Sequence, residues 1–268
     1  MTTVFHTWRR ASTIAALLVL AGCASSPSPN ITLVPANQVV SETEKDGLFT
    51  QPLKFERSKP GCRGECPKLT VDSLVFPGHA KLTELVDHAL ATMTGLNPDQ
   101  PPPYDTIAGF ERYFWETAAP RDEVLLAAKT RYRSEGLTVL ELDSWQYFTG
   151  AAHGVSATQF LNWDNSRQIV LGLAQILEPG KTDAWVDALK AAHGRWLETQ
   201  DPYKSDPDGY LRLWPFQPSD NFALTDLGVV VKYGSYELAP YSSGQPELLI
   251  PYNALQGILR PGFLPRGV

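Results

Sequence analysis

Stretches in which hydrophobic and polar residues alternate recur along the chain and predict β-strands, because successive side chains of a strand point to opposite faces. The clearest is residues 123–133, where Lys129 and Arg131 alternate with less polar residues. Predicted strands cover residues 53–57, 68–76, 123–133, 137–148, 156–163 and 168–171, a hairpin over 221–233, and residues 247–250. Short polar or glycine-containing segments separate several of them, notably residues 134–136 and 149–154.

Three other stretches repeat apolar residues at spacings of three and four, which is typical of helices packed on one side. They cover residues 82–93, 107–117 and 185–196. We expect Thr182 to cap the third helix, and Pro251 to open a last short helix over residues 252–258. Residues 201–220, rich in proline and aspartate, are expected to form a loop. Strand runs interrupted by a few helices predict an α+β fold with a mainly antiparallel sheet.

The composition is that of an ordinary globular protein, with 268 residues of which 43% are hydrophobic and 19% are charged. This length accommodates one or two domains with a sizeable core. The net charge of −6 argues against a nucleic-acid-binding protein, because phosphate backbones require a basic face. An acidic surface would instead attract cationic partners.

The first 22 residues are predicted to be an export signal. Arg9 and Arg10 precede an apolar stretch over residues 14–21, which is shorter than the roughly 20 residues of a membrane-spanning helix. The alternative is a buried N-terminal helix. Leu-Ala-Gly-Cys at residues 20–23 resembles the lipobox of bacterial lipoproteins. That resemblance implies cleavage before Cys23, attachment of diacylglycerol to its sulfur, and a further acyl chain such as palmitate on the new N-terminus.

A lipid anchor of this kind places the mature chain in the cell envelope, and Ala24 after the cysteine favours the outer membrane, facing the periplasm. Cleavage would remove two arginines and no acidic residue, so the net charge would become −8. Residues 23–51 lack apolar periodicity and are predicted to be a tether. We expect an N-terminal strand-and-helix unit over residues 52–119 and a C-terminal α+β domain over residues 120–268.

Cys62 and Cys66 are the two cysteines beyond the export signal and its lipobox. An exported protein favours oxidised thiols, and three intervening residues that include a glycine can bring the sulfurs together. The alternative is half of a metal site, but no second Cys/His pair occurs at ligand spacing. The sequence therefore predicts a disulfide and no bound metal or other cofactor.

The sequence contains no complete hydrolase or phosphate-loop motif, and residues 154–158 lack the final glycine of a nucleophile elbow. His79 is expected near the start of a helix, and His88 and His193 are expected to be solvated or at the core edge of theirs. Only His153 has an unusual setting, among small residues that let the backbone turn sharply.

Two acidic residues, Glu141 and Asp143, are predicted to lie on one face of the strand over residues 137–148. A paired general acid and base would need these carboxylates at a defined separation across a cleft. Solvated acids on the polar face of a half-buried strand explain the same spacing, and we favour that interpretation.

Residues 147–154, Tyr-Phe-Thr-Gly-Ala-Ala-His-Gly, resemble the Tyr-x-Gly-Gly-Ala-His-Gly hairpin of the RsiV family of extracytoplasmic domains. Residues 236–244, Tyr-Glu-Leu-Ala-Pro-Tyr-Ser-Ser-Gly, resemble that family's Tyr-x-Ile-Ala-Pro-Tyr-Ala-x-Gly segment. Residues 221–224 are similar to the start of its closing hairpin, and residues 249–252 to its Ile-Pro position. Ala151 departs from the pattern by replacing a usual glycine.

The founding member of the family is an anti-sigma factor whose outer domain binds lysozyme as a signal. Its sigma-binding segment and membrane helix have no counterpart in this sequence, where a lipobox stands instead. The resemblance, which spans about residues 136–259, therefore implies only the outer binding module. It implies a binding surface made of Tyr147, Thr149, Gly150, His153, Gly154, Tyr236, Pro240, Tyr241, Ser243 and Gly244.

Tyr252 is a further candidate for a side chain that anchors the partner, beside Tyr147, Tyr236 and Tyr241. The alternative for each of these tyrosines is a position at the edge of the core, with its hydroxyl hydrogen-bonded inside the protein. We expect a non-enzymatic envelope lipoprotein that binds or inhibits a lysozyme-like cell-wall hydrolase or another cationic envelope protein. One alternative is a scaffold that binds peptidoglycan or lipid. The other is a cell-wall-modifying enzyme that uses His153 with a nearby acid.

Overall fold

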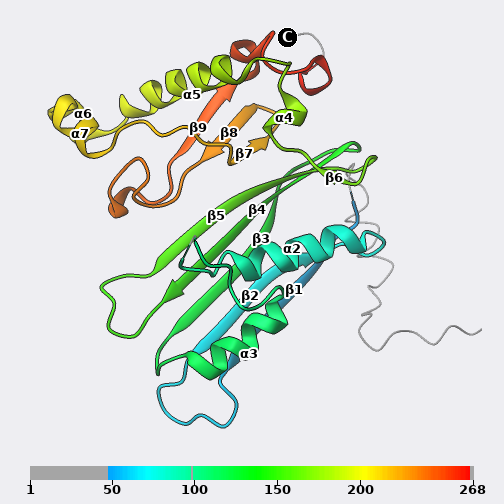
Figure 1. Cartoon of the computed structure of the whole chain (residues 1–268), viewed down its shortest axis with the longest axis vertical. Coiled ribbons are helices and arrows are strands. Elements are labelled where there is room, and N and C mark those ends of the chain that lie inside the picture. Colours follow the sequence, from blue (N-terminus) through cyan, green and yellow to red (C-terminus); the bar gives the residue numbers. More distant parts are fainter. Residues whose placement is uncertain (1–47, 98, 266–268) are drawn as a thin grey trace, which may run out of the picture. The chain divides into compact units, whose positions relative to one another are not determined.

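The structure is a computed structural model that describes residues 48–97 and 99–265 (Figure 1). The predicted export signal, Cys23 and most of the predicted tether lie outside the described residues. Within the two described ranges, no helix combines the length and the apolar character needed to span a membrane.

A six-stranded sheet forms the centre of the fold, with its strands in sequence order from β1 to β6. Its strands are β1 (Gln51–Ser58), β2 (Lys68–Val75), β3 (Glu123–Arg133), β4 (Leu137–Tyr147), β5 (Val155–Asp164) and β6 (Ile169–Val170). Neighbours are antiparallel except β2 and β3, which are parallel. Parallel neighbours require a crossover connection, and here it contains α2 (Ala80–Thr92) and α3 (Ile107–Thr117).

A second, three-stranded antiparallel sheet follows in the order β7, β8, β9. Its strands are β7 (Phe222–Leu224), β8 (Gly228–Lys232) and β9 (Glu247–Pro251), and α5 (Thr182–Leu197) packs on β9. Short helices lie in the connections: α4 (Leu173–Ile176), α6 (Asp201–Ser205), α7 (Pro207–Leu213) and η1 (Tyr241–Ser243). Two more, η2 (Tyr252–Leu255) and η3 (Pro261–Phe263), follow β9. The predicted α+β class with a mainly antiparallel sheet is confirmed.

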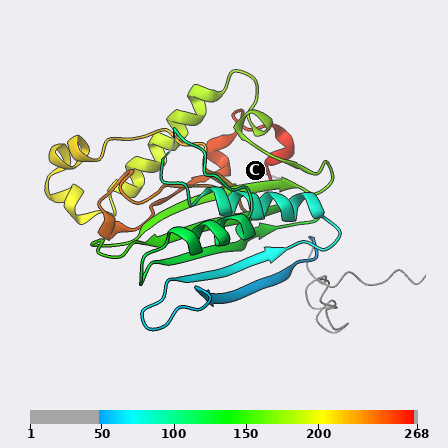
Figure 2. The ribbon, with the colours of Figure 1, turned by 60° about the horizontal axis from the view of Figure 1, so that its bottom comes forward.

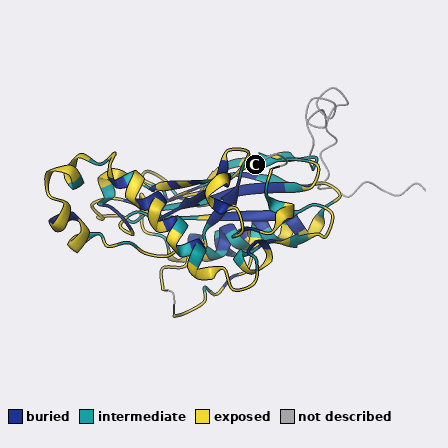
Figure 3. Ribbon diagram, turned by 90° about the horizontal axis from the view of Figure 1, so that it is seen from above, coloured by how far each residue is buried: buried dark blue, intermediate teal, exposed yellow. Residues whose placement is uncertain are grey.

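The two faces of the six-stranded sheet are covered differently. Helices α2 and α3 lie on one face, and the second sheet contacts β4 and β5 on the other (Figures 1 and 2). Along β4, Leu140 and Leu142 join the hydrophobic cluster beneath the helices, whereas Val139 joins the cluster of the second sheet and α5. The central strands are therefore buried while the outer faces of the helices remain exposed (Figure 3).

Two local predictions are wrong. Helix α5 begins at Thr182 itself, with Lys181 at the cap position. Residues 201–220 are not all loop, because they contain α6 and α7. The Asp206 side chain caps α7 by accepting a 3.0 Å hydrogen bond from a first-turn backbone N–H, and Pro207 occupies the first helical position. An acidic cap followed by proline is a helix start, although the segment's proline and aspartate content resembles a loop.

The histidines other than His153 have structural positions. His79 is the N-cap residue of α2, as predicted, and His88 is exposed on that helix. His193 is not solvated but buried, with its ring against Trp196 and Phe216. Burial lowers the pKa of His193, which favours a neutral ring.

The predicted disulfide between Cys62 and Cys66 is confirmed, and it closes the connection between β1 and β2. In the part of the chain that the structure describes, no group of three or more histidine, cysteine or acidic side chains is placed to hold a metal ion.

Candidate functional site

The hairpin between β4 and β5 is held at its root by a buried carboxylate. Asp122 Oδ1 accepts hydrogen bonds from the backbone N–H and the hydroxyl of Thr149, at 2.7 and 2.8 Å. The hydroxyl of Thr149 also lies against the carbonyl of Pro120. The next residue, Gly150, has a φ of 90°, a conformation that side-chain-bearing residues rarely adopt. Thr149 and Gly150 therefore shape the turn.

Gly154 allows the hairpin to close against an indole ring. A Cβ atom at this position would lie well inside contact distance of the Trp145 ring, so only glycine fits without a shift. The carbonyl of Gly154 also accepts a 2.9 Å hydrogen bond from Nδ1 of His153. The two residues together fix the direction in which the imidazole points.

The structure brings the two resembling segments together through His153. Its ring stacks on Tyr241, with centroids 4.2 Å apart and planes at 23°. Because Nδ1 carries the hydrogen donated to the Gly154 carbonyl, Nε2 has a free lone pair and accepts the hydroxyl hydrogen of Tyr236 at 3.1 Å. Both partners of the ring nitrogens are uncharged, and neither is a carboxylate.

The segment between β8 and β9 presents its tyrosines from a rigid turn. Tyr236 has a positive φ of 70°, which is uncommon for a bulky residue. The turn continues through Pro240, whose carbonyl accepts the N–H of Ser243 at 2.9 Å, and it ends at Gly244 with a φ of 69°. Buried Leu238 fixes the segment to the core. The predicted residues Pro240, Ser243 and Gly244 thus shape the loop that carries the tyrosines.

Trp214 completes this surface, and sequence reasoning missed it. Its ring stacks on Tyr236, with centroids 6.2 Å apart and planes at 27°. Trp214 directly follows α7, within the segment predicted to be a loop. The Asp-Pro pair at residues 206–207 is typical of a helix start and could have revealed the helix from the sequence. His153, Trp214, Tyr236 and Tyr241 are here called the aromatic rim. Its members come from the β4–β5 hairpin, the end of α7 and the β8–β9 connection, on one side of the molecule (Figure 1).

Two tyrosines named from the sequence make none of the ring contacts that hold the rim together. Tyr147 lies beside Trp145 on β4, with ring centroids 6.4 Å apart. Tyr252 is buried and donates a 2.6 Å hydrogen bond to the carbonyl of Thr225. Burial raises the pKa of Tyr252 to about 12. Tyr252 is therefore a core residue with its hydroxyl bonded inside the protein, which is the alternative considered for the tyrosines in the sequence analysis.

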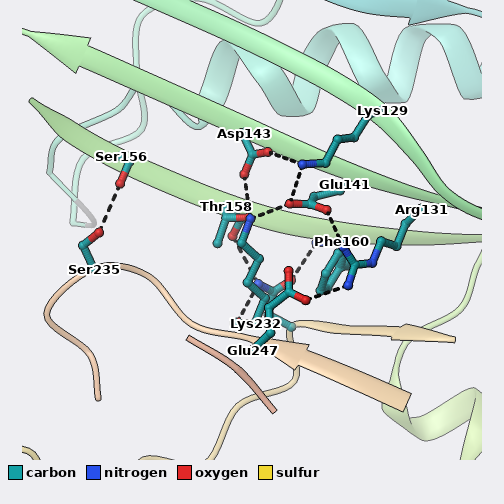
Figure 4. A network of polar contacts seen from close by, with 11 residues as sticks. Lys129, Arg131, Glu141, Asp143, Ser156, Thr158, Phe160, Lys232, Ser235 and Glu247 are labelled. Carbon is teal, nitrogen blue, oxygen red and sulfur yellow. Dashed lines mark hydrogen bonds and ion pairs between the residues drawn. The ribbon is translucent and has the colours of Figure 1, made fainter. Parts of the chain in front are cut away.

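A buried ion network lies between β4 and β8, and Figure 4 shows it. Nζ of Lys232 lies 2.5 Å from Oε1 of Glu141 and 3.2 Å from Oδ1 of Asp143. The Glu141 side chain is only 1% exposed, so the prediction of a solvated acid is wrong for this residue. The reason is that the second sheet covers this face of β4 and brings Lys232, a residue 91 positions later, as the counterion.

Two further cations approach the same carboxylate from β3. Lys129 lies 3.0 Å from Glu141, and Arg131 bridges Glu141 at 3.5 Å to Glu247 at 2.6 Å. Burial raises the pKa of Glu141, but the hydrogen bonds and charges of Lys232 and Lys129 outweigh it, so the net pKa lies below its ordinary value. A carboxylate held ionised in this way is poorly suited to act as a general acid, and we interpret the network as a link between the sheets.

A pocket of about 790 Å³ lies at the other end of β4. Its lining includes Tyr132 and Leu137, next to the β3–β4 turn, and Tyr252 from the second sheet's end. Arg260, which also lines it, is already bonded to the backbone carbonyls of Leu177 and an α4 residue. The aromatic rim is therefore separate from this pocket.

Comparison with known proteins assigns the family. A family model described as a protein of unknown function, DUF3298, matches residues 174–253. A crystal structure described as a DUF3298 family protein from Pseudomonas aeruginosa is 37% identical to this chain, with a TM-score of 0.75. The alignment covers 82% of this chain and 98% of that one. This chain belongs to the DUF3298 family.

A second crystal structure, of a DUF3298 member from Bacteroides fragilis, is 19% identical, with a TM-score of 0.62 and coverage of 81% of this chain and 95% of that one. At this identity the likeness shows the fold alone. No curated protein matches this DUF3298 chain. The match to the family model includes residues 236–244, which carry the tyrosines, but it begins after the hairpin over residues 149–154. The aromatic rim therefore combines residues inside the matched region with His153, which lies outside it.

Proposed function

We propose that this DUF3298 protein is a non-enzymatic envelope lipoprotein whose aromatic rim binds a cationic protein partner, in the first place a lysozyme-like cell-wall hydrolase. The observation that carries the proposal is the stacking of His153 on Tyr241, 4.2 Å apart. It unites on one exposed surface the two segments that resemble the lysozyme-binding RsiV family.

The chemistry of the rim fits protein recognition. Tyr236 is 50% exposed, and its ring is held between His153 and Trp214. Aromatic side chains that are fixed before binding lose little conformational entropy, and tyrosine and tryptophan dominate binding hot spots. The partners of His153, a carbonyl and a phenol, orient the ring without supplying a charge that would activate it.

Electrostatics support the same class of partner. The chain carries a net charge of −6, which would become −8 after the proposed cleavage. An acidic protein steers a basic one toward it and repels other acidic proteins. We expect the association rate to fall as salt concentration rises, because screening shortens the range of this attraction.

Lipidation at Cys23 is part of the proposal. Mass spectrometry of the N-terminal peptide of the membrane-extracted protein tests it directly. We expect a modified Cys23 at the N-terminus and, for a Cys23→Ser variant, an uncleaved chain. An unmodified Cys23 inside a longer N-terminal peptide would contradict the anchor but leave the binding proposal in place.

The binding test is a calorimetric titration of the full-length protein, in mild detergent, against a panel of purified lysozymes that includes the egg-white enzyme. A lytic assay run in parallel measures inhibition. Tyr236→Asn is the test variant, because asparagine tolerates the positive φ of this position. Tyr113→Asn on α3 is the matched control, since Tyr113 is a tyrosine of similar exposure, 42%, outside the rim.

We expect saturable binding by the wild-type protein, a Kd at least about tenfold higher for Tyr236→Asn, and no change for Tyr113→Asn. No heat and no loss of lytic activity at high micromolar concentration would rule out this partner class. Binding to purified sacculi instead would favour the scaffold alternative. Wall-directed activity that disappears in His153→Ala would favour the enzyme.

A further inference from the structure

Helix α7 carries an apolar surface that no sequence motif marks. Leu213, its last residue, is 72% exposed, and Leu211 is also exposed. They adjoin Trp214, whose ring stacks on Tyr236 of the aromatic rim. Leu211, Leu213 and Trp214 are here called the α7 patch. A large leucine left in water beside exposed aromatic rings is a feature of interaction surfaces.

The α7 patch is held in place by the same segment that carries the rim. Tyr210 is buried and its hydroxyl lies 3.5 Å from the carbonyl of Leu238. At the start of the helix, the Asp206 side chain accepts the N–H of Gly209, where a Cβ would collide with that carboxylate. The leucines are therefore presented from a helix that is capped at its start and bonded at its middle to the β8–β9 connection, which limits the ordering cost of binding.

The charges beside the α7 patch indicate what would cover it. Asp206 and Asp208 belong to the start of α7, and Glu237 follows Tyr236, whereas Arg212 is the one basic residue of the helix itself. The residues named here carry a net negative charge, although Arg212 lies between the two leucines. An apolar patch in a net acidic segment complements a basic protein surface that has its own apolar patch.

We infer that the partner proposed for the rim also contacts the α7 patch, and that Leu213 inserts into an apolar depression on that basic protein. The inference rests on the proposed function and extends the binding surface beyond the two resembling segments. A partner that engages both surfaces buries apolar area from Leu213 in addition to the aromatic contacts, so loss of this side chain weakens binding without altering the rim.

The test compares Leu213→Ser with Leu227→Ser in the full-length protein. Leu227 is a matched control, because it is 71% exposed and lies in the β7–β8 turn, at the end of β8 away from Tyr236. Both variants change one exposed leucine to serine, so both should keep the wild-type melting temperature and circular dichroism. Calorimetry with egg-white lysozyme and the rest of the panel supplies the Kd values.

We expect the Kd of Leu213→Ser to rise at least about tenfold and that of Leu227→Ser to stay within about twofold of wild type. Equal affinities for wild type and Leu213→Ser would overturn the α7 contact while leaving the proposed function intact. No binding by the wild-type protein would overturn both. A wild-type dimer by light scattering that Leu213→Ser converts to monomer would assign the patch to self-association and overturn the inference.

Discussion

Replacing Lys232 by methionine tests the ion network between the sheets. The ammonium group contacts Glu141 at 2.5 Å and Asp143 at 3.2 Å, and the Lys232 side chain is only 8% exposed. Methionine keeps much of the apolar stem but leaves the buried Glu141 carboxylate without its closest cation. Breaking a buried pair in this way costs about 3–5 kcal/mol. Because Lys129 and Arg131 remain near Glu141, we expect the lower end, about 3 kcal/mol.

Lys129→Met is the matched control, since it removes another cation from the same carboxylate. The Lys129 side chain is 59% exposed, so water already screens its 3.0 Å pair with Glu141. We expect a loss of less than about 1 kcal/mol. Urea unfolding at pH 7, followed by circular dichroism, measures both values. Equal losses for the two variants, or a loss below about 1 kcal/mol for Lys232→Met, would refute the buried-pair reasoning.

The stability lost in Lys232→Met should depend on pH, and the direction of that dependence follows from Glu141. The folded-state pKa of Glu141 lies below its ordinary value of 4.5, so the ionised carboxylate contributes stability above that pH and loses it as pH falls through the lowered pKa. Protonation removes the charge that Lys232 neutralises. The stability difference between wild type and Lys232→Met should therefore narrow as the solution is acidified. A difference that stays constant from pH 7 to pH 3 would contradict this sign.

Three more changes probe the site and the core. Gly154→Ala should cost about 1–3 kcal/mol in urea unfolding, because its Cβ displaces the Trp145 ring; an unchanged midpoint would contradict the tight fit. Asp122→Ala leaves the backbone N–H of Thr149 without its acceptor, while the Thr149 hydroxyl keeps the Pro120 carbonyl, and should cost about 1–3 kcal/mol, with faster hydrogen exchange at the hairpin; unchanged exchange would show that the anchor is dispensable. Tyr252→Phe should cost about 1 kcal/mol in thermal unfolding and leave partner affinity unchanged, since this hydroxyl is bonded inside the core; weaker partner binding would place Tyr252 in the binding surface after all.

Local patterns were sufficient for most elements of the fold. The period-two pattern predicts the strand over residues 123–133, which the structure shows as β3 with the same bounds. Helical spacing likewise predicts α2 and α3, within a few residues of their observed ends. These signals succeed because side-chain direction follows directly from backbone geometry. Residues 201–220 are the exception, since a helix of one or two turns has too few positions to display a period.

Only separate parts of the candidate site could be predicted from the sequence. The two segments around His153 and Tyr241 were recognisable separately, but 83 residues separate His153 from Tyr236, and no local pattern states that they touch. Trp214 had no motif at all, and it joins the rim because the end of α7 lies against the β8–β9 connection. Contacts of this kind depend on how whole elements pack.

By itself, the sequence determined the long strands and helices, the α+β class and the pairing of Cys62 with Cys66, all of which depend on neighbours a few positions apart. The tertiary structure decided that β2 and β3 run parallel, that Glu141 is buried against Lys232, and that the aromatic rim exists. The alternating pattern of β4 distinguishes its two faces but cannot say what covers each one. A polar face is solvated or holds a buried ion pair according to whether a distant strand with a complementary charge packs on it.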